Sequence, residues 1–148
     1  MRGWGLTNAG TIILITGSGG ALGAVLQATA IGEYLGEVLA QWNIGIFVPF
    51  IIAAGLKTAQ GSSTVSIITT ASLMVPLLAP LGLGPVLVTL AIGSGAMTVS
   101  HANDSYFWVV SRFSGMEVSQ AYQLHTLGTA AAGLSGILVV FLLSLAVL

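Results

Sequence analysis

Long apolar stretches, separated by short runs of glycine, proline and polar residues, make up most of the chain. Residues 3–32, 58–103 and 118–148 contain no Asp, Glu, Lys or Arg. A helix that spans the hydrocarbon core of a membrane needs about 20 apolar residues. The middle stretch is therefore too long for a single crossing, and the breaks in the pattern divide the chain into four or five helical elements.

The breaks differ from one apolar block to the next. A first block over residues 7–30 contains a cluster of glycines, and a second over residues 44–79 is split by the polar run KTAQGSST at residues 57–64. Each half of the second block is too short to span a membrane alone. A third block loses its apolar character in GSGAMTVSHANDS, residues 93–105, whereas residues 126–148 form the only unbroken span.

A polar break inside an apolar block has a physical consequence. Backbone N–H and C=O groups cannot go unpaired in hydrocarbon, so such a break must face protein or a water-filled cavity. Secondary transporters build their substrate and ion sites from discontinuous helices near the middle of the membrane. We therefore predict a binding site at the two polar breaks, with loops at the membrane surface as the alternative.

Composition excludes several other classes of protein. The 148 residues include three basic and four acidic side chains, so 5% are charged, and 55% are hydrophobic. A soluble domain carries roughly 25% charged residues. Three basic residues are also too few for a nucleic-acid-binding surface, and the absence of cysteine excludes disulfides and thiolate metal sites. The sequence predicts an integral membrane protein with no metal and no other cofactor.

The first polar break has the features of a helix start. Gln60 and Gly61 predict an irregular turn, and the three hydroxyls at residues 62–64 are suited to capping a new helix. The free N–H groups and the positive dipole end at a helix start favour a carboxylate or phosphate. Hydroxyls continue at helical spacing from Ser66 to Thr70, which suits a polyhydroxylated ligand. The alternative is that these hydroxyls bond to the carbonyls of their own helix.

The second polar break, SHANDS at residues 100–105, contains His101 and Asp104. An ionisable residue at membrane depth is costly and is therefore a candidate functional group. A histidine titrates near neutral pH, and burial favours the protonated form of a carboxyl group. Either side chain is a candidate carrier of a coupling proton. The alternatives are an ion pair between Asp104 and Arg112 or Lys57, and a loop at the membrane surface.

Two motifs resemble enzyme signatures but are not supported by their surroundings. TIILITGSGGALG, residues 11–23, reads as the strand, glycine-rich turn and helix of a dinucleotide-binding fold. A chain with so few charges cannot form a soluble α/β sheet, and a glycine-hinged or re-entrant membrane segment fits better. GLSG at residues 133–136 is similar to the serine motif of rhomboid intramembrane proteases. These enzymes need a histidine on a later helix, and no histidine follows the motif here. We therefore expect that the protein is not an enzyme.

Three segments together resemble the carboxy-terminal part of the gluconate:proton symporter (gluconate permease) family. They are ILITGSGGALG, AQGSSTVSIITTASLMVPLL and SHANDSYFWVVSRFSGM, at residues 13–23, 59–78 and 100–116. The resemblance covers almost the whole chain. It implies uptake of gluconate or a related small hydroxylated organic acid with protons across the bacterial inner membrane. More distantly, the order of the motifs is similar to one repeat of the ion-transporter superfamily, whose members have inverted repeats and move by an elevator motion.

The resemblance also implies a fold. We expect an all-α, polytopic, multi-pass membrane protein in which residues 1–148 form one repeat of an inverted-repeat secondary transporter. This repeat would have a glycine-rich re-entrant hairpin and two discontinuous helices. Family members are considerably longer than this chain and contain an amino-terminal repeat as well. We therefore expect that repeat to be the partner of residues 1–148, and we also expect a homo-oligomer. The alternatives are a channel-like or non-transporting membrane subunit, and a fragment that is inactive alone.

The expected mechanism assigns the substrate carboxylate to residues 62–64, with the substrate hydroxyls bonded to Gln60, Ser66 and Asn103. The residues expected to bind the substrate are Gly17, Ser18, Gly19, Gly20, Gln60, Gly61, Ser62, Ser63, Thr64, Ser66, Ser100, Asn103 and Ser105. Asp104 and His101 are expected to couple binding to the proton.

Overall fold

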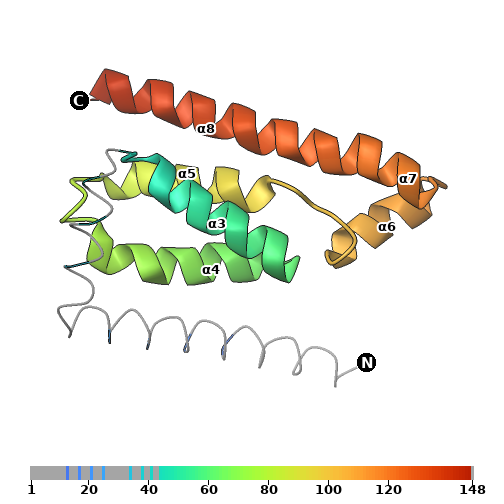
Figure 1. The fold of residues 1–148 in the computed structure, drawn as a ribbon, viewed down its shortest axis with the longest axis horizontal. Coiled ribbons are helices and arrows are strands. Elements are labelled where there is room, and N and C mark those ends of the chain that lie inside the picture. Colours follow the sequence, from blue (N-terminus) through green and yellow to red (C-terminus); the bar gives the residue numbers. More distant parts are fainter. Residues whose placement is uncertain are drawn as a thin grey trace.

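The computed structural model describes residues 44–147 and seven single positions before them. These positions are Ile13, Gly17, Ala21, Val25, Tyr34, Val38 and Gln41. Over residues 44–147 the chain consists of helices joined by turns, with no strand (Figure 1). The all-α prediction is confirmed for this part of the chain. The glycine-rich segment expected to form a re-entrant hairpin lies outside the described residues, except for Ile13, Gly17 and Ala21, which are helical and exposed.

The first polar break forms the tip of a helical hairpin. Helix α3 (Phe47–Gln60) ends at Gly61, whose left-handed backbone (φ 72°) lets its N–H donate to the Lys57 carbonyl at 2.8 Å. Helix α4 (Ser63–Met74) then returns along α3 and continues into a 3₁₀ turn, η1 (Val75–Leu77) (Figure 1). Ser62 caps α4 because its hydroxyl accepts from the N–H of Val65 at 3.3 Å. The predicted turn and cap are confirmed. The first break is not the interruption of a discontinuous helix that we expected, because α4 packs back along α3 and the break is the tip of a hairpin.

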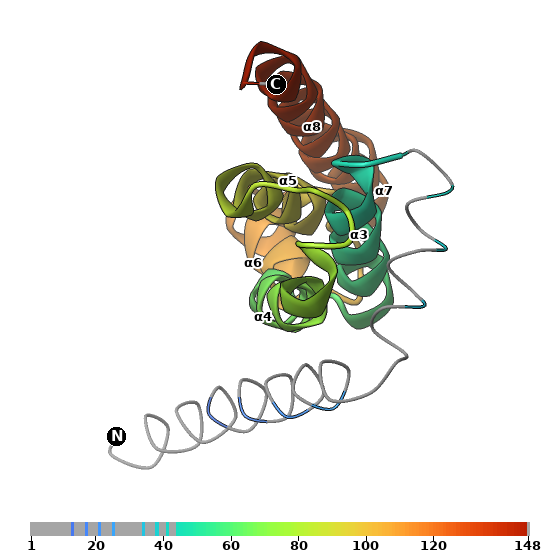
Figure 2. The ribbon, with the colours of Figure 1, turned by 90° about the vertical axis from the view of Figure 1, so that its left-hand side faces the viewer.

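The second polar break separates α5 (Pro85–Met97) from α6 (Ser105–Phe113). Helix α5 contacts α3, α4 and α8, and it lies between α8 and α4 in the view of Figure 2. A turn at residues 114–117 follows α6. The chain is then continuously helical through a short helix α7 (Val118–Ala121), a π-helical turn η2 (Tyr122–Thr126) and the long helix α8 (Leu127–Val147). The chain thus runs outward through α5 and α6 and returns along α5 through α8 (Figure 1).

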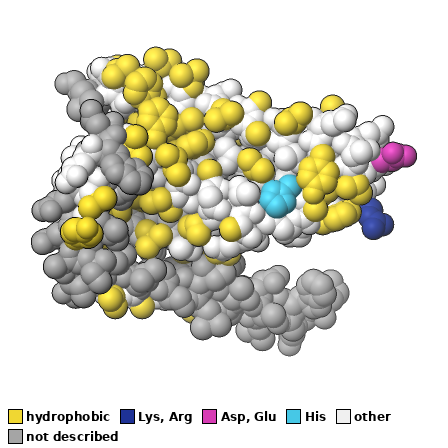
Figure 3. All heavy atoms as spheres, viewed as in Figure 1, with side chains coloured by type: hydrophobic (Ala, Val, Ile, Leu, Met, Phe, Trp, Pro, Cys, Tyr) yellow, Lys and Arg dark blue, Asp and Glu magenta, His cyan; other side chains and the backbone are white. Residues whose placement is uncertain are grey.

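The last of these segments matches the predicted unbroken span. Within the described residues, Val118–Ala146 is the one helix long and apolar enough to cross a membrane. It begins several residues before the predicted start because α7 and η2 join α8. On the face shown in Figure 3, hydrophobic side chains are spread along the helices, whereas charged ones gather at the end where α6 and α7 lie. Many large hydrophobic side chains are exposed, including seven of α8, and large exposed apolar surfaces mark sites of membrane or protein contact.

The core forms where α3, α5 and α8 meet. Its buried side chains include Ala53 from α3, Ala91 and Ile92 from α5, and Ile137 and Val140 from α8. The small residues let the helices approach closely, which replaces the hydrophobic driving force that is missing between helices in lipid. Dispersion contacts at short range are then the main source of packing energy.

At Gly133, α8 packs tightly against the end of α5. A Cβ atom at this position would lie 2.2 Å from Cγ2 of Thr98 and 2.8 Å from the carbonyl oxygen of Ser94. We predict that Gly133→Ala lowers the free energy of unfolding by about 1–3 kcal/mol, the usual cost of overpacking. Gly128→Ala on the same helix is the control, because a Cβ at the exposed Gly128 meets no described atom within 4 Å. Equal stability of the two variants in detergent unfolding would contradict this packing.

Candidate functional site

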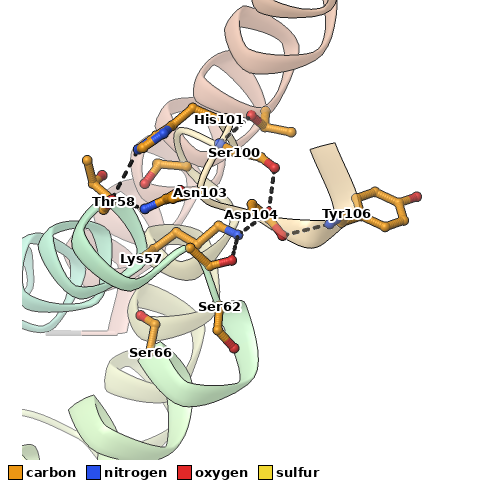
Figure 4. A network of polar contacts seen from close by, with 12 residues as sticks. Lys57, Thr58, Ser62, Ser66, Ser100, His101, Asn103, Asp104 and Tyr106 are labelled. Carbon is orange, nitrogen blue, oxygen red and sulfur yellow. Dashed lines mark hydrogen bonds and ion pairs between the residues drawn. The ribbon is translucent and has the colours of Figure 1, made fainter. Parts of the chain in front are cut away.

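The two polar breaks meet at one place in the structure (Figure 4). The side-chain amide of Asn103 donates to the carbonyl of Thr58 at 2.8 Å, and Nε2 of His101 donates to the same carbonyl at 3.1 Å. The contact also involves backbone, because a Cβ on Gly61 would lie 2.3 Å from the Asn103 carbonyl oxygen. The predicted convergence of the two breaks is therefore present in the fold, through contacts between residues more than 40 positions apart.

A buried ion pair lies at the centre of this contact. The ammonium group of Lys57 bonds to Oδ2 of Asp104, and the two side chains are 2% and 9% exposed. Lys57 also donates to the carbonyl of Gly61 at 3.4 Å. The hydroxyl of Ser100 donates to Oδ2 of Asp104, while Oδ1 accepts from the N–H of Tyr106 at 2.9 Å. These donors stabilise the ionised carboxylate, so the structure has the ion pair with Lys57 that the sequence left open as an alternative.

The helix ends explain why the fold tolerates two buried charges. Lys57 lies in the last turn of α3, where the helix dipole is negative, and Asp104 is the N-cap of α6, where the dipole is positive. Breaking a buried ion pair by removing one partner costs far more than the pair itself contributes, because the remaining charge is left without compensation. The pair therefore ties the hairpin tip to the second break.

A cavity of about 400 Å³ opens beside the ion pair. Its size lies in the range of small-molecule sites, roughly 300–1,000 Å³. Both breaks and α8 contribute to its wall, which is formed by Lys57, Gly61, Ser62, Ser63, Thr64, Met97, Ser100, Asp104, Ser105, Tyr106, Thr129 and Ala132. The cavity thus offers hydroxyl groups, the first turn of α4 and one ammonium group. Within the described part of the chain, no three His, Asp or Glu side chains could hold a metal ion.

The structure brings together most of the predicted site residues on the two breaks. Those that line the cavity are Gly61, Ser62, Ser63, Thr64, Ser100, Asp104 and Ser105. Asn103 and His101 instead hold the last turn of α3. Gln60 is exposed and does not line the cavity. Ser18, Gly19 and Gly20 lie outside the described residues.

Ser66 and Thr70 are buried in the protein and do not line the cavity. Ser66 is fully buried, and its hydroxyl donates to the carbonyl of Ala53 at 2.6 Å, across the hairpin. Thr70 is also fully buried, and its hydroxyl has no hydrogen-bond partner among the described residues. Ser72 donates back to the carbonyl of Ile68 at 3.0 Å. In this conformation, these hydroxyls serve the packing of α4.

Three residues that the sequence pattern did not single out hold Ser100 in place. Thr126 donates to the Ser100 carbonyl at 2.6 Å, and Thr129 accepts from the Ser100 N–H at 3.1 Å. Nε2 of His125 lies 3.2 Å from the Ser100 hydroxyl oxygen. His125 and Thr126 belong to the π-helical turn η2, a distortion that is frequent at functional sites. A sequence signal exists: polar residues recur at 125, 126 and 129 at the start of an otherwise apolar helix.

The hairpin tip depends on Gly61. Its positive φ is unfavourable for other residues, and a Cβ would overlap the backbone of Asn103. We predict that Gly61→Ala separates the two breaks and lowers the free energy of unfolding by about 2–4 kcal/mol, combining the strain of the left-handed backbone with overpacking. Gly55→Ala is the control, since Gly55 lies within α3 and a Cβ there meets no described atom within 4 Å. Chemical unfolding in detergent measures the stability of both variants. Equal stabilities would contradict the close contact between Gly61 and the backbone of Asn103.

An apolar helical fold whose broken helices converge on a polar, charged cavity is the arrangement typical of secondary membrane transporters. A family model described as GntP family permease matches residues 1–146 of the chain. The chain therefore belongs to the GntP family of permeases, and the resemblance found in the sequence is confirmed.

Known relatives agree with this family. The chain is 38% identical to the inner membrane permease YgbN of Escherichia coli over 94% of its length. It is 40% identical to a permease of Haemophilus influenzae over 92%, and 32% identical to a gluconate permease of Pseudomonas aeruginosa over 95%. The chain spans only about 30% of the length of these relatives (31%, 29% and 32%). No solved structure matches the chain.

Proposed function

We propose that this chain is the carboxy-terminal part of a permease that takes up gluconate or a related small hydroxylated organic acid together with protons. The observation that carries the proposal is the buried Lys57–Asp104 pair in the wall of a hydroxyl-lined cavity. The family supports it, since a relative from Pseudomonas aeruginosa is named a gluconate permease and relatives from Escherichia coli are named an inner membrane permease and a low-affinity gluconate transporter. We place the chain in the bacterial inner membrane.

In this proposal the substrate carboxylate binds at the start of α4. The first N–H groups of a helix have no partner within the helix, and the positive dipole end favours an anion. Residues 62–64 of this turn and the ammonium group of Lys57 line the same cavity, so both attract the carboxylate to one place. For the substrate hydroxyls we propose Ser63, Ser100 and Ser105, because Gln60, Ser66 and Asn103 do not line the cavity in this conformation.

The proton would act by changing the partner of Lys57. As a carboxylate, Asp104 holds the ammonium group of Lys57. Once protonated, Asp104 no longer neutralises this charge, and the ammonium group is free to bind the carboxylate of the substrate. Binding of a proton and of an anion then favour each other, which is the coupling that a symporter needs. His101 is the other candidate for the proton, through its position next to the carbonyl of Thr58.

The proposed arrangement in the membrane follows from helix lengths. The 14 residues of α3 extend about 21 Å at 1.5 Å per residue, less than the roughly 30 Å of a hydrocarbon core. We therefore propose that α3 and α4 enter and leave the membrane on one side as a re-entrant hairpin, that α5 and α6 form a discontinuous helix, and that α8 spans. The glycine-rich segment around Gly17 would form a second hairpin. An amino-terminal repeat would supply the facing wall of the site in a multi-pass, alternating-access carrier. We further propose that the carrier assembles as a homo-oligomer.

A chimeric permease tests the proposed function. In this chimera, residues 1–148 replace the carboxy-terminal third of the Pseudomonas aeruginosa gluconate permease. Uptake of labelled gluconate is then measured in proteoliposomes with and without an inward proton gradient. We expect accumulation above the external concentration that collapses with the gradient and is inhibited by other small hydroxylated acids but not by a neutral sugar. Uptake that only equilibrates would indicate a channel, and gradient-independent accumulation would contradict proton coupling. The unmodified gluconate permease is the positive control.

A further inference from the structure

His125 is connected to Asp104 through one hydroxyl group. Nε2 of His125 lies 3.2 Å from Oγ of Ser100, and this Oγ donates its hydrogen to Oδ2 of Asp104. Since the only hydrogen of the Ser100 hydroxyl is directed at Asp104, the hydroxyl oxygen must accept from His125. The bonding pattern therefore assigns the proton to Nε2 of His125 and gives a chain of two hydrogen bonds that run in the same direction.

The surroundings hold this chain of bonds in place. Thr126 and Thr129, from η2 and α8, bind the carbonyl and the N–H of Ser100. The imidazole ring lies near the rings of Tyr106 and Phe107 of α6, with centroids 5.8 Å and 6.1 Å away. The titratable and charged groups that face it are Tyr106 on α6, Asp104 beyond Ser100, and Lys57 of α3 beyond Asp104. His125 is half-buried, so its ring also reaches the outside of this cluster.

We propose that His125 delivers the coupling proton to Asp104 through the hydroxyl of Ser100. In this step the Nε2–H bond of the His125 imidazolium breaks as an O–H bond forms on Ser100, and the original hydroxyl hydrogen of Ser100 moves to Oδ2 of Asp104. His125 becomes neutral, Ser100 is again a hydroxyl, and Asp104 becomes a carboxylic acid. No other reactant is needed. The role rests on the proposed function, because a delivered proton matters only if Asp104 controls the partner of Lys57.

The backbone beside Ser100 adds a second reason to expect movement here. Val99 has a positive φ of 43°, which is a strained conformation for a β-branched residue. Strain of this kind clusters at active sites, ligand clamps and switch regions. Protonation of Asp104 removes the charge that holds Ser100 and Lys57 together, so the break between α5 and α6 is positioned to respond to the arriving proton.

Infrared spectroscopy of the full chain in lipid nanodiscs tests the relay without requiring transport. The chain has only four carboxyl side chains, so the band of protonated Asp104 is identified by its absence in Asp104→Asn. A light-triggered pH drop starts the reaction. We expect His125→Gln and Ser100→Ala to slow the appearance of the band by about 100-fold, the lower range for a positioned acid–base group. Ser100→Thr, which keeps a hydroxyl, should react faster than Ser100→Ala. Gln123→Ala, which changes an exposed residue of the same turn, should react at the wild-type rate.

Protonation of Asp104 at the wild-type rate in His125→Gln would overturn the relay, as would a Ser100→Thr variant as slow as Ser100→Ala. In the chimeric permease, His125→Gln should lower net proton-driven uptake more than counterflow, the exchange of labelled for unlabelled gluconate at equal pH. Equal losses of net uptake and of counterflow would also contradict the relay, because a purely structural role of His125 would affect the two activities alike. If the chimeric permease carries no acid at all, the proposed function fails, while the infrared rates still decide the relay.

Discussion

Asp104→Asn is expected to abolish concentrative, proton-driven uptake in the chimeric permease while leaving gluconate binding insensitive to pH. The amide cannot take up a proton, and it cannot neutralise Lys57 as a carboxylate does. Lys57 is then available to the substrate anion at every pH, so binding no longer depends on the proton and transport is uncoupled from it. Uptake of labelled gluconate at several pH values, with binding measured on the same protein, checks both parts.

Glu117→Gln is the matched control, since it removes the negative charge of an exposed residue at the start of α7. It should leave the pH dependence of uptake as it is. Undiminished and still proton-driven uptake in Asp104→Asn would eliminate Asp104 as the coupling group and leave His101 as the remaining candidate from the sequence.

Lys57→Met should destabilise the protein and remove substrate binding together. The substitution keeps an unbranched side chain but leaves Asp104 buried without its partner, at a cost of about 3–5 kcal/mol. Loss of a charge-assisted bond to the substrate, about 1.5–3 kcal/mol, lowers gluconate affinity by about 10-fold to 100-fold. Chemical unfolding in detergent and equilibrium binding of labelled gluconate measure the two effects separately.

The double variant Lys57→Met with Asp104→Asn separates stability from function. Because neither side chain is then charged, most of the lost stability should return, as it does when both partners of a buried pair are replaced. Uptake should not return, since no ammonium group is left for the carboxylate. A double variant that accumulates gluconate would show that the pair is only structural.

Local signals allowed part of this fold to be predicted from the sequence. The cap at Ser62 and the turn at Gly61 depend on neighbouring residues, and both are present. The unbroken last helix follows from its apolar length, although it starts earlier than predicted, at Val118. The two breaks were expected to meet because polar backbone inside lipid must face a partner. These predictions use rules that act within a few residues or apply to any membrane protein.

The remaining features depend on contacts between distant residues. Ser66 has the spacing of a cavity-lining hydroxyl, but its partner is the carbonyl of Ala53 on α3, the other arm of the hairpin. In so apolar a chain, the pattern of side chains does not indicate which face of α4 packs on α3. His125 contacts Ser100 across 25 positions, and only the path of α8 beside α5 brings them together.

Protection of a single cysteine by substrate tests the central claim most directly, because the chain contains no cysteine of its own. Ser63→Cys places a thiol in the wall of the proposed site, and Ser114→Cys places one at the exposed end of α6. In a chimeric permease otherwise free of cysteine, gluconate should slow the reaction of the thiol at position 63 with a small thiol reagent and leave that at position 114 unchanged. The concentration for half-protection should match that for half-maximal uptake. If saturating gluconate left the reaction at position 63 unaffected while uptake saturated, the substrate would bind elsewhere and the two breaks would not form its site.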